Sequence, residues 1–334
     1  MRTGKSGPVT LADVAREAGV SLATASRVIN GSERRPAPEL VERVTRAAER
    51  LGYSVNAAAQ AIARGVTSVV GLIVSDIADP YFSSIAAGVT EEAERHGLLV
   101  TLASTKGRPE REVDYLSALR RQRPLAIVLA GSRRDHPAAE RRLATELRSF
   151  RDGGGRAAAI SQPGLDIDTV AVRNAEGAAE LGQALVNLGY RRFGVLTGPP
   201  DLRTAVDRTA GFAGCAAIAD FQRGAFTRDG GRQAARQLLR RKPDLDCLFA
   251  VNDVMAIGAM VAARELGYRI PEDLAIAGFD DIPSAGDAFP ALTTVRIDLE
   301  ALGREAMRLV LTPAAEPRVE YATGTVVLRA STKR

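Results

Sequence analysis

The stretch "VTLADVAREAGVSLATASRVINGS", residues 9–32, decides the fold of the amino-terminal part of this 334-residue chain. Thr10, followed three residues later by Asp13, predicts a capping box at the start of a helix. An apolar helix face then repeats with helical spacing, at Leu11, Val14, Ala15 and Ala18. The stretch therefore begins with a short amphipathic helix.

A turn and two further helices follow this first helix. Gly19 supplies a left-handed turn, Val20 fills the corner, and Ser21 caps a second helix that Asn30-Gly31 ends. The apolar residues that we expect to point inward on the second and third helices are Ala25, Val28, Ile29, Leu40, Val41, Val44, Ala48 and Leu51. The side chains that we expect to point outward near the start of the second helix are Leu22, Ala23, Ser26 and Arg27. Three such helices predict a helix-turn-helix, whose second helix enters the major groove of DNA, with an ordinary helical hairpin as the alternative.

After residue 66, short apolar strands alternate with helices of 10 to 15 residues. The predicted strands are 69–74, 98–103, 125–130, 156–160, 168–172, 192–197, 246–251, 273–278, 293–297 and 325–329. The predicted helices are 83–96, 110–122, 137–151, 175–188, 229–240, 253–266 and 298–311. This alternation predicts doubly wound parallel sheets, and its length fits two α/β subdomains.

Composition narrows the class of function. Residues 1–66 carry ten Lys and Arg against six Asp and Glu, so most of the chain's net charge of +5 lies in the predicted DNA-binding part. The start of the chain has no apolar signal segment and no run is long enough to cross a membrane, so we expect a cytoplasmic protein with Cys215 and Cys247 as buried thiols. His96 and His136 are isolated, and Gly153-Gly154-Gly155 lacks the Lys-Ser/Thr of a phosphate loop. We therefore expect no catalytic residues, no metal and no cofactor.

The chain resembles the LacI/GalR family of bacterial transcriptional regulators. The similarity begins with residues 9–31 and continues through "RVTRAAERLGYSVNAAAQAIARG", "VVGLIVSDIADPYFSSIAAGV", "VLTGPPDLRTAVDRTAGF", "FAVNDVMAIGAMVAARELGYRIPEDLAIAGFDDIP" and "PALTTVRIDLEALGREA". These blocks cover nearly the whole chain in the family's order.

The resemblance implies a domain organisation. A helix-turn-helix headpiece covers residues 1–55, a hinge helix 56–66, and a periplasmic-binding-protein-like core 67–334. The core has one subdomain made of 67–165 and 296–318 and another made of 166–295 and 319–330, joined by three crossovers. No heptad tail follows the last strand, so we expect a homodimer rather than a tetramer.

The resemblance also implies residues that contact DNA. Leu22 and Ala23 take the family's principal base-reading positions, and Arg27 follows on the same face. Phosphate contacts or helix capping are expected of Thr10, Ser21, Thr24, Ser26 and Asn30. In the hinge, Asn56 begins the helix, Ala59 packs on the partner and Ile62 is the minor-groove wedge. This chain departs from the family by having Ile62 where Leu is usual and Val55 where Pro is usual.

Effector contacts are expected at the ends of strands that face the cleft. Asp79, Tyr81 and Phe82 follow the first core strand, and the resemblance adds Arg208, Phe226, Asn252 and Asp280. Ser161 and Gln162 replace a polar pair that family members often carry, and the segment between Phe212 and Phe226 is shorter than usual. Arg, Asn and Asp beside aromatic rings suit a neutral sugar or small glycoside.

We therefore expect a repressor that binds near-palindromic double-stranded operator DNA and is released by a sugar. The first alternative is a corepressor-type regulator that responds to a non-sugar metabolite. A solute-binding protein of a transport system would share the core fold, but the predicted headpiece argues against it. A sugar-metabolising enzyme lacks any catalytic constellation.

Overall fold

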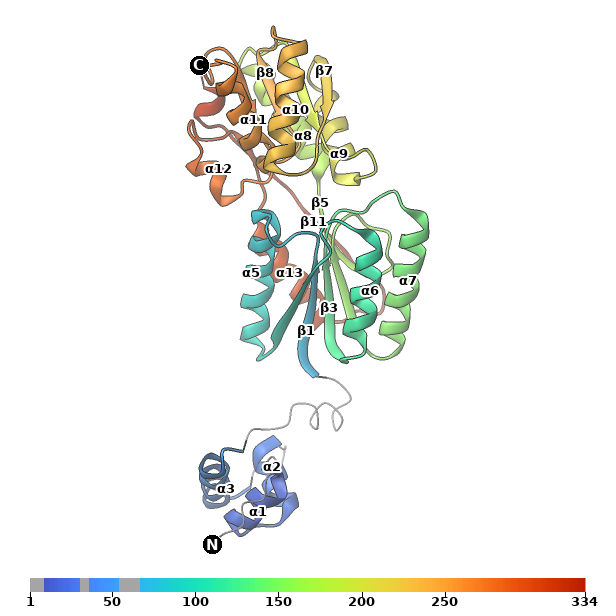
Figure 1. The fold of residues 1–334 in the computed structure, drawn as a ribbon. Helices are drawn as coiled ribbons and strands as arrows, with labels where there is room; N and C mark the ends of the chain where they lie inside the picture. Colours follow the sequence, from blue (N-terminus) through green and yellow to red (C-terminus); the bar gives the residue numbers. More distant parts are fainter. Residues whose placement is uncertain (1–8, 31–35, 54–66, 334) are drawn as a thin grey trace. The chain divides into compact units, whose positions relative to one another are not determined.

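The computed structural model describes residues 9–30, 36–53 and 67–333. The chain divides into two compact units, one before and one after the boundary between Thr67 and Ser68 (Figure 1).

Among its described residues, the first unit contains three helices, α1 (Leu11–Ala18), α2 (Leu22–Asn30) and α3 (Pro38–Leu51). The predicted capping box is confirmed, because Thr10 Oγ1 accepts from Asp13 N at 3.3 Å and Asp13 Oδ2 accepts from Thr10 N at 3.0 Å. Gly19 has a φ of 61°, the left-handed conformation that the tight turn to α2 requires. The local sequence therefore sets the angle between α1 and α2.

Small aliphatic side chains form the core of the first unit: Val14, Ala15, Ala18, Ala25, Val44, Ala47 and Ala48. The prediction for Val41 is wrong, since its side chain is exposed and Ala47 is buried instead. Val41 lies at the edge of the apolar stripe of α3, and α1 and α2 pack nearer its centre. Arg43 of α3 donates to the carbonyl of Ala18 at 2.6 Å, which ties α3 to the turn.

The second unit contains two α/β subdomains. The first is built on a six-stranded sheet with the strand order β11-β5-β4-β3-β1-β2. Its elements are β1 (Thr67–Val74), α5 (Pro80–Arg95), β2 (Leu99–Ser104), α6 (Pro109–Arg120), β3 (Pro124–Ala130), α7 (Pro137–Asp152), β4 (Arg156–Ile160), β5 (Asp168–Val172), α13 (Leu299–Leu311) and β11 (Val319–Ala322). Helices α6 and α7 cover one face of this sheet, and α5 and α13 cover the other (Figure 1).

The second subdomain is built on a four-stranded parallel sheet with the order β7-β6-β8-β9. Its elements are α8 (Asn174–Asn187), β6 (Phe193–Thr197), α9 (Arg203–Ala213), β7 (Ile218–Arg223), α10 (Arg228–Arg241), β8 (Cys247–Ala250), α11 (Asp253–Glu265), β9 (Ala275–Ala277) and α12 (Pro283–Asp287). An antiparallel pair, β10 (Thr294–Arg296) with β12 (Thr325–Val327), and a 3₁₀ turn at Ala330–Thr332 complete it.

The chain passes between the subdomains three times: after β5, between β10 and α13, and between β11 and β12. The predicted subdomain boundaries at 165/166 and 318/319 are therefore wrong, because β5 and β11 belong to the six-stranded sheet. β5 pairs in parallel with both β4 and β11, and Asp168 accepts from Arg318 N at 2.7 Å. A strand that ends one subdomain and a strand that begins the next look the same in a sequence pattern.

Several elements lie outside the sequence predictions: α9, β7, α12 and β11. Neither cysteine forms a disulfide, but Cys215 is exposed where the sequence predicted a buried thiol. It lies just beyond the end of α9, an element that the prediction did not include. None of the described helices combines the length and the apolar character that a membrane span requires.

Candidate functional site

The amino end of α2 presents small and apolar side chains on an open surface. Leu22 is 54% exposed, and Ala23 and Arg27 are exposed as well. A shallow groove on this surface is lined by Thr10, Leu11, Ala12, Leu22, Ala23 and Ser26. The predicted reading face is therefore outward and continuous with the first turn of α1.

Polar residues beside this face are engaged in holding α2. Ser21 Oγ accepts from Thr24 N at 3.1 Å and lies 2.8 Å from Thr24 Oγ1. Both side chains keep oxygen lone pairs that can accept, and Thr24 is half-buried. Asn30 is the last residue of α2. The three hinge positions, Asn56, Ala59 and Ile62, lie outside the described residues.

In the second unit, one cavity of about 320 Å³ lies between the two subdomains. Every side chain for which the sequence predicted an effector contact lines it: Asp79, Tyr81, Phe82, Ser161, Gln162, Arg208, Phe226, Asn252 and Asp280. They come from both sheets, at the ends of β1, β4 and β8, from the loop after β9, from α9 and from the loop before α10. Their meeting in one place is what a ligand site at facing strand ends requires.

Arg208 is the centre of the polar wall. Its side chain is only 3% exposed, Nε donates to Asn174 Oδ1 at 2.8 Å, and Nη1 donates to the carbonyl of Val251 at 2.8 Å. The guanidinium also lies over the ring of Phe279, 3.8 Å from its centroid. Arg208 is therefore held in one position by three separate segments of the second subdomain.

Asp280 faces Arg208 across 2.8 Å, from Oδ1 to Nη2. That oxygen is buried, yet it makes no well-aligned hydrogen bond, because the ion-pair geometry is poor. Burial raises the pKa of Asp280 to about 8, although Arg208 opposes the shift. Asp280 also has a φ of 120°, a conformation rare for a residue with a side chain. A buried, incompletely bonded oxygen at this position suits a hydroxyl donor on a ligand.

The rest of the cavity wall carries the carboxylate of Asp79 and aromatic rings from both subdomains. Asp79 caps α5 by accepting from Tyr81 N at 3.0 Å, and burial raises the pKa of its carboxyl. Tyr81 and Phe82 are packed edge to face with centroids 5.0 Å apart. Phe226 comes from the other subdomain and lies against the bare backbone of Gly198, where a Cβ would come within 2.2 Å of its ring. The short segment before Phe226 thus still delivers the ring to the cavity.

Asn252 has two roles in this wall. It is the N-cap of α11, because its Oδ1 accepts from Met255 N at 3.0 Å, and it lines the cavity. Its neighbour Asp253 points away, and its fully buried carboxylate accepts from Ile282 N at 3.0 Å and from Thr294 Oγ1 at 2.7 Å. Burial raises the pKa of Asp253 to about 6. Asp253 is therefore a structural residue.

The side-chain amide of Gln162 is already engaged with the protein. Its Oε1 accepts from Arg133 N at 2.9 Å, and its Nε2 donates to Thr204 Oγ1 at 2.9 Å. Ser161 Oγ donates to the carbonyl of Gln162 at 2.9 Å. Both residues line the cavity as predicted, but their polar atoms bind the chain itself.

Some cavity residues escaped the sequence prediction: Lys106, Ser132, Arg134, Asn174, Leu202 and Thr204. Asn174 lies two residues beyond the end of β5, so the strand-end rule that identified Asp79 would have found it had β5 been placed in the first sheet. Thr204 lies in the first turn of α9, which the sequence pattern did not indicate. Within the described residues, no group of three or more His, Cys, Asp and Glu could hold a metal ion.

Comparison with known proteins gives a consistent result across the chain. Residues 10–56 match "Bacterial regulatory proteins, lacI family", and residues 183–332 match "Periplasmic binding protein-like domain". The HTH-type transcriptional regulator CelR of Thermobifida fusca is 34% identical over 90% of this chain and 91% of its own length. The structure of a CelR–cellobiose complex covers 97% of this chain and 99% of its own, with a TM-score of 0.69 and 31% identity. A lac repressor dimer bound to operator and the anti-inducer ONPF shares the fold, with a TM-score of 0.85 over 98% of this chain and 100% of its own, at 24% identity.

Proposed function

Since the chain belongs to the LacI family of bacterial regulatory proteins and is a DNA-binding transcriptional regulator, we propose that it is a repressor released from its operator by a neutral sugar or small glycoside. The proposal that a sugar is the effector rests on one observation. All nine side chains that the sequence predicted to contact an effector line a single cavity between the subdomains. DNA is the target, so the protein acts in the cytoplasm.

The DNA half of the proposal rests on the exposed start of α2. Leu22 and Ala23 offer apolar contact, such as with a thymine methyl, and Arg27 reaches a base edge or a phosphate. The polar residues expected at phosphates are Thr10, Ser21, Thr24, Ser26 and Asn30. The hinge residues Asn56, Ala59 and Ile62 join the two headpieces across the minor groove in the same proposal.

A homodimer would bring two headpieces to a near-palindromic operator. Two exposed apolar places on the core support a partner copy. Strand β2 is the edge of the six-stranded sheet and exposes Leu99, at 72%, and Leu102. Phe289, beyond α12, is 86% exposed. Edge strands with exposed apolar side chains are normally covered in soluble proteins, and a second copy would cover this one.

A neutral sugar fits the charges and rings of the cavity. Hydroxyls can donate to Asp280 and Asp79 and can accept from the Nδ2 of Asn252, while Phe82 and Phe226 cover an apolar sugar face. A strongly anionic ligand would meet the carboxyl groups of Asp79 and Asp280. The two arginines that line the cavity, Arg208 and Arg134, are already bonded to the protein. The relative CelR binds cellobiose in its solved complex, which supports a glycoside of similar kind for this chain.

The proposed mechanism links the two halves through the closure of the cleft. Closure on the effector moves the first subdomains of the dimer relative to each other, and the hinge connects each of them to a headpiece. Operator affinity then depends on the effector, and effector affinity depends on operator to the same degree.

Removing residues 1–64 tests this proposal. The full chain should bind a duplex from the region upstream of its own gene, with an affinity that falls steeply as salt rises. The truncated core should lose that binding entirely, yet the same sugar should raise the melting temperature of both proteins in a thermal-shift panel that includes cellobiose. A core that still shifts operator DNA, or a purine that binds and strengthens the operator complex, would contradict it.

A further inference from the structure

Two loops from different subdomains meet beside the effector cavity. The first, residues 132–135, follows β3 of the six-stranded sheet, and the second, residues 201–204, leads into α9 of the other subdomain. Arg134 and Leu202 form an antiparallel bridge. Asp135 N donates to the carbonyl of Asp201 at 2.8 Å, and Arg203 N donates to the carbonyl of Arg133 at 3.0 Å. We call these two loops together with Gln162 the clasp.

Side chains of the clasp add further contacts across the cleft. Arg134 Nη1 lies 2.6 Å from Asp201 Oδ2, and Thr204 N donates to Ser132 Oγ at 3.0 Å. Gln162 joins both loops, because it accepts from Arg133 N and donates to Thr204 Oγ1. The bond between Gln162 and Arg133 lies within the first subdomain. The other contacts link the two subdomains, and each would break if the subdomains separated here.

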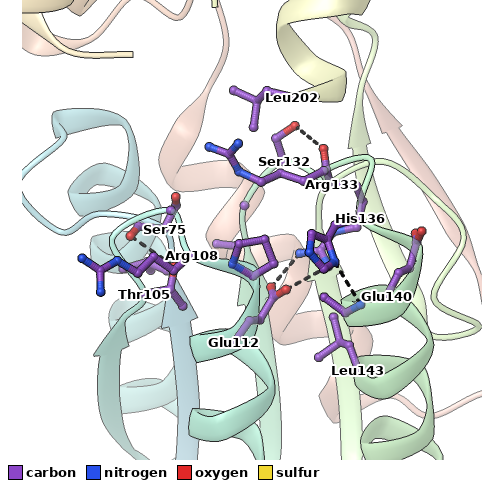
Figure 2. A pocket seen from close by; sticks show the side chains of 17 residues that line it. Ser75, Thr105, Arg108, Glu112, Ser132, Arg133, His136, Glu140, Leu143 and Leu202 are labelled. Carbon is purple, nitrogen blue, oxygen red and sulfur yellow. Dashed lines mark hydrogen bonds and ion pairs between the residues drawn. The ribbon is translucent and has the colours of Figure 1, made fainter. Parts of the chain in front are cut away.

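The first loop is fixed to its own subdomain. Arg133 is only 6% exposed, and its Nη1 and Nη2 donate to the two carboxylate oxygens of Glu112 on α6, at 3.0 and 2.6 Å. Figure 2 shows this pair beside His136 and, across the gap, Leu202 of the second loop. Because the loop cannot follow α9 when the cleft opens, opening must break the clasp rather than stretch it.

The clasp also forms part of the cavity wall, since Ser132, Arg134, Gln162, Leu202 and Thr204 all line it. Its ion pair is partly exposed, at 26% for Arg134 and 42% for Asp201, so that pair by itself contributes little. The backbone pairing and the Gln162 bridge act together with it, because all of them are lost in a single opening step.

We propose that the clasp holds the core closed through contacts of the chain itself, and that its strength sets how much effector is needed for induction. This inference rests on the proposed function and adds its regulation. An effector that binds only the closed form has an apparent dissociation constant equal to the intrinsic one divided by the closed fraction. Gln162 and Thr204 line the cavity, but their polar atoms bond each other across the cleft, so they act as positioning residues for the closed state.

Double electron–electron resonance on the full chain tests the closed fraction without DNA or effector. Spin labels go on cysteines at Arg148 of α7 and Arg240 of α10, which are exposed and lie on different subdomains, in a Cys215→Ser background. Dilution with unlabelled protein restricts the measurement to distances within one chain. Cys247 is fully buried and stays unlabelled.

The test variant combines Asp201→Asn with Thr204→Val, which removes the ion pair and the hydroxyl that Gln162 bonds while keeping both side-chain shapes. We expect the parent to show mainly the distance of the closed structure, and the variant to show a second distance, with the ratio of closed to open falling about tenfold. The matched control is Asp244→Asn, whose partner Arg192 lies 3.1 Å away within the same subdomain. It should leave the distribution unchanged.

Three results would overturn the clasp: a parent that is mainly open, a variant distribution identical to the parent, or an equal change in the control. If the double variant does not fold by circular dichroism, Thr204→Val alone is measured with the same expectation of a second distance. Since the samples contain neither operator nor sugar, failure here leaves the proposed function standing, and failure of the truncation experiment leaves the clasp measurement valid.

Discussion

The headpiece and the cavity place their functional side chains in opposite environments. In the headpiece, Leu22, Ala23 and Arg27 stand in solvent on a helix supported by a core of Ala and Val. In the cavity, Arg208 and Asp280 are almost fully buried and form an ion pair before any ligand is considered.

This difference predicts how each region responds to substitution. Truncating an exposed side chain removes its own contact, and water replaces it at little further loss. Truncating a buried charged group leaves its partners desolvated and unpaired, which is the larger loss. The same Arg→Ala change should therefore have different consequences in the two regions.

Arg208→Ala should give the largest effect, a loss of roughly 2–4 kcal/mol in effector affinity measured by calorimetry, because it strands Asn174 and Asp280. Operator affinity should stay nearly unchanged, so the cell would show permanent repression. Arg192→Ala, an exposed arginine of the same subdomain, is the matched control. Loss of operator binding by a folded Arg208→Ala protein would break the comparison.

Arg27→Ala should have the next largest effect, a loss of about 1–3 kcal/mol in operator affinity with little change in melting temperature. The affinities for operator and random duplexes, measured by fluorescence anisotropy over a salt series, decide how Arg27 acts. Equal losses on both duplexes with a shallower salt slope indicate a phosphate contact, and a loss confined to the operator indicates base reading. The control is Arg16→Ala on α1, which is exposed and pairs with Asp13. A fall in stability instead would mean that Arg27 is structural.

Per unit of pH, the smallest effect should come from the titration of Asp280. The unfolded chain releases the Asp280 proton near pH 4, whereas the folded chain keeps it until about pH 8. The contribution of Asp280 to stability is therefore greatest below pH 4. It falls as pH rises to about 8, by at most about 1.4 kcal/mol per pH unit. Burial also raises the pKa of Asp253, to about 6, so its contribution fades between pH 6 and 8 while that of Asp280 continues.

Denaturant unfolding of the parent and of Asp280→Asn over that interval provides the measurement. The variant should have the flatter slope. Parallel slopes for the two proteins would show that Asp280 is ionised in the folded state and that its pair with Arg208 outweighs its burial.

Sequence reasoning worked best where structure is local. The capping box of Thr10 and Asp13, the left-handed Gly19 and the Ser21 cap each depend on residues within one turn, and all are confirmed. The two-subdomain core also followed from the alternation of strands and helices. Asp79, Tyr81 and Phe82 followed from the end of the first core strand, but Arg208, Phe226, Asn252 and Asp280 were predicted from the family resemblance.

The errors arose where long-range pairing decides the outcome. Nothing in the sequence of β5 says that it pairs with β11, about 150 residues later, so the crossover was placed too early. Gln162 was assigned to the effector, but its amide bonds Arg133 and Thr204, which come from two other loops. The sequence around one residue does not show which distant residues its side chain will contact.

Asn252 is both the cap of α11 and a cavity residue, and this double use constrains how the regulator can diversify. A substitution that alters ligand recognition at this position also removes a helix cap. A genetic screen could therefore not separate loss of stability from altered specificity in such variants. Phe226 caps no helix; its ring packs against the core and the bare backbone of Gly198. Evolution toward a new effector, or its redesign, has the easier route through Phe226 than through Asn252.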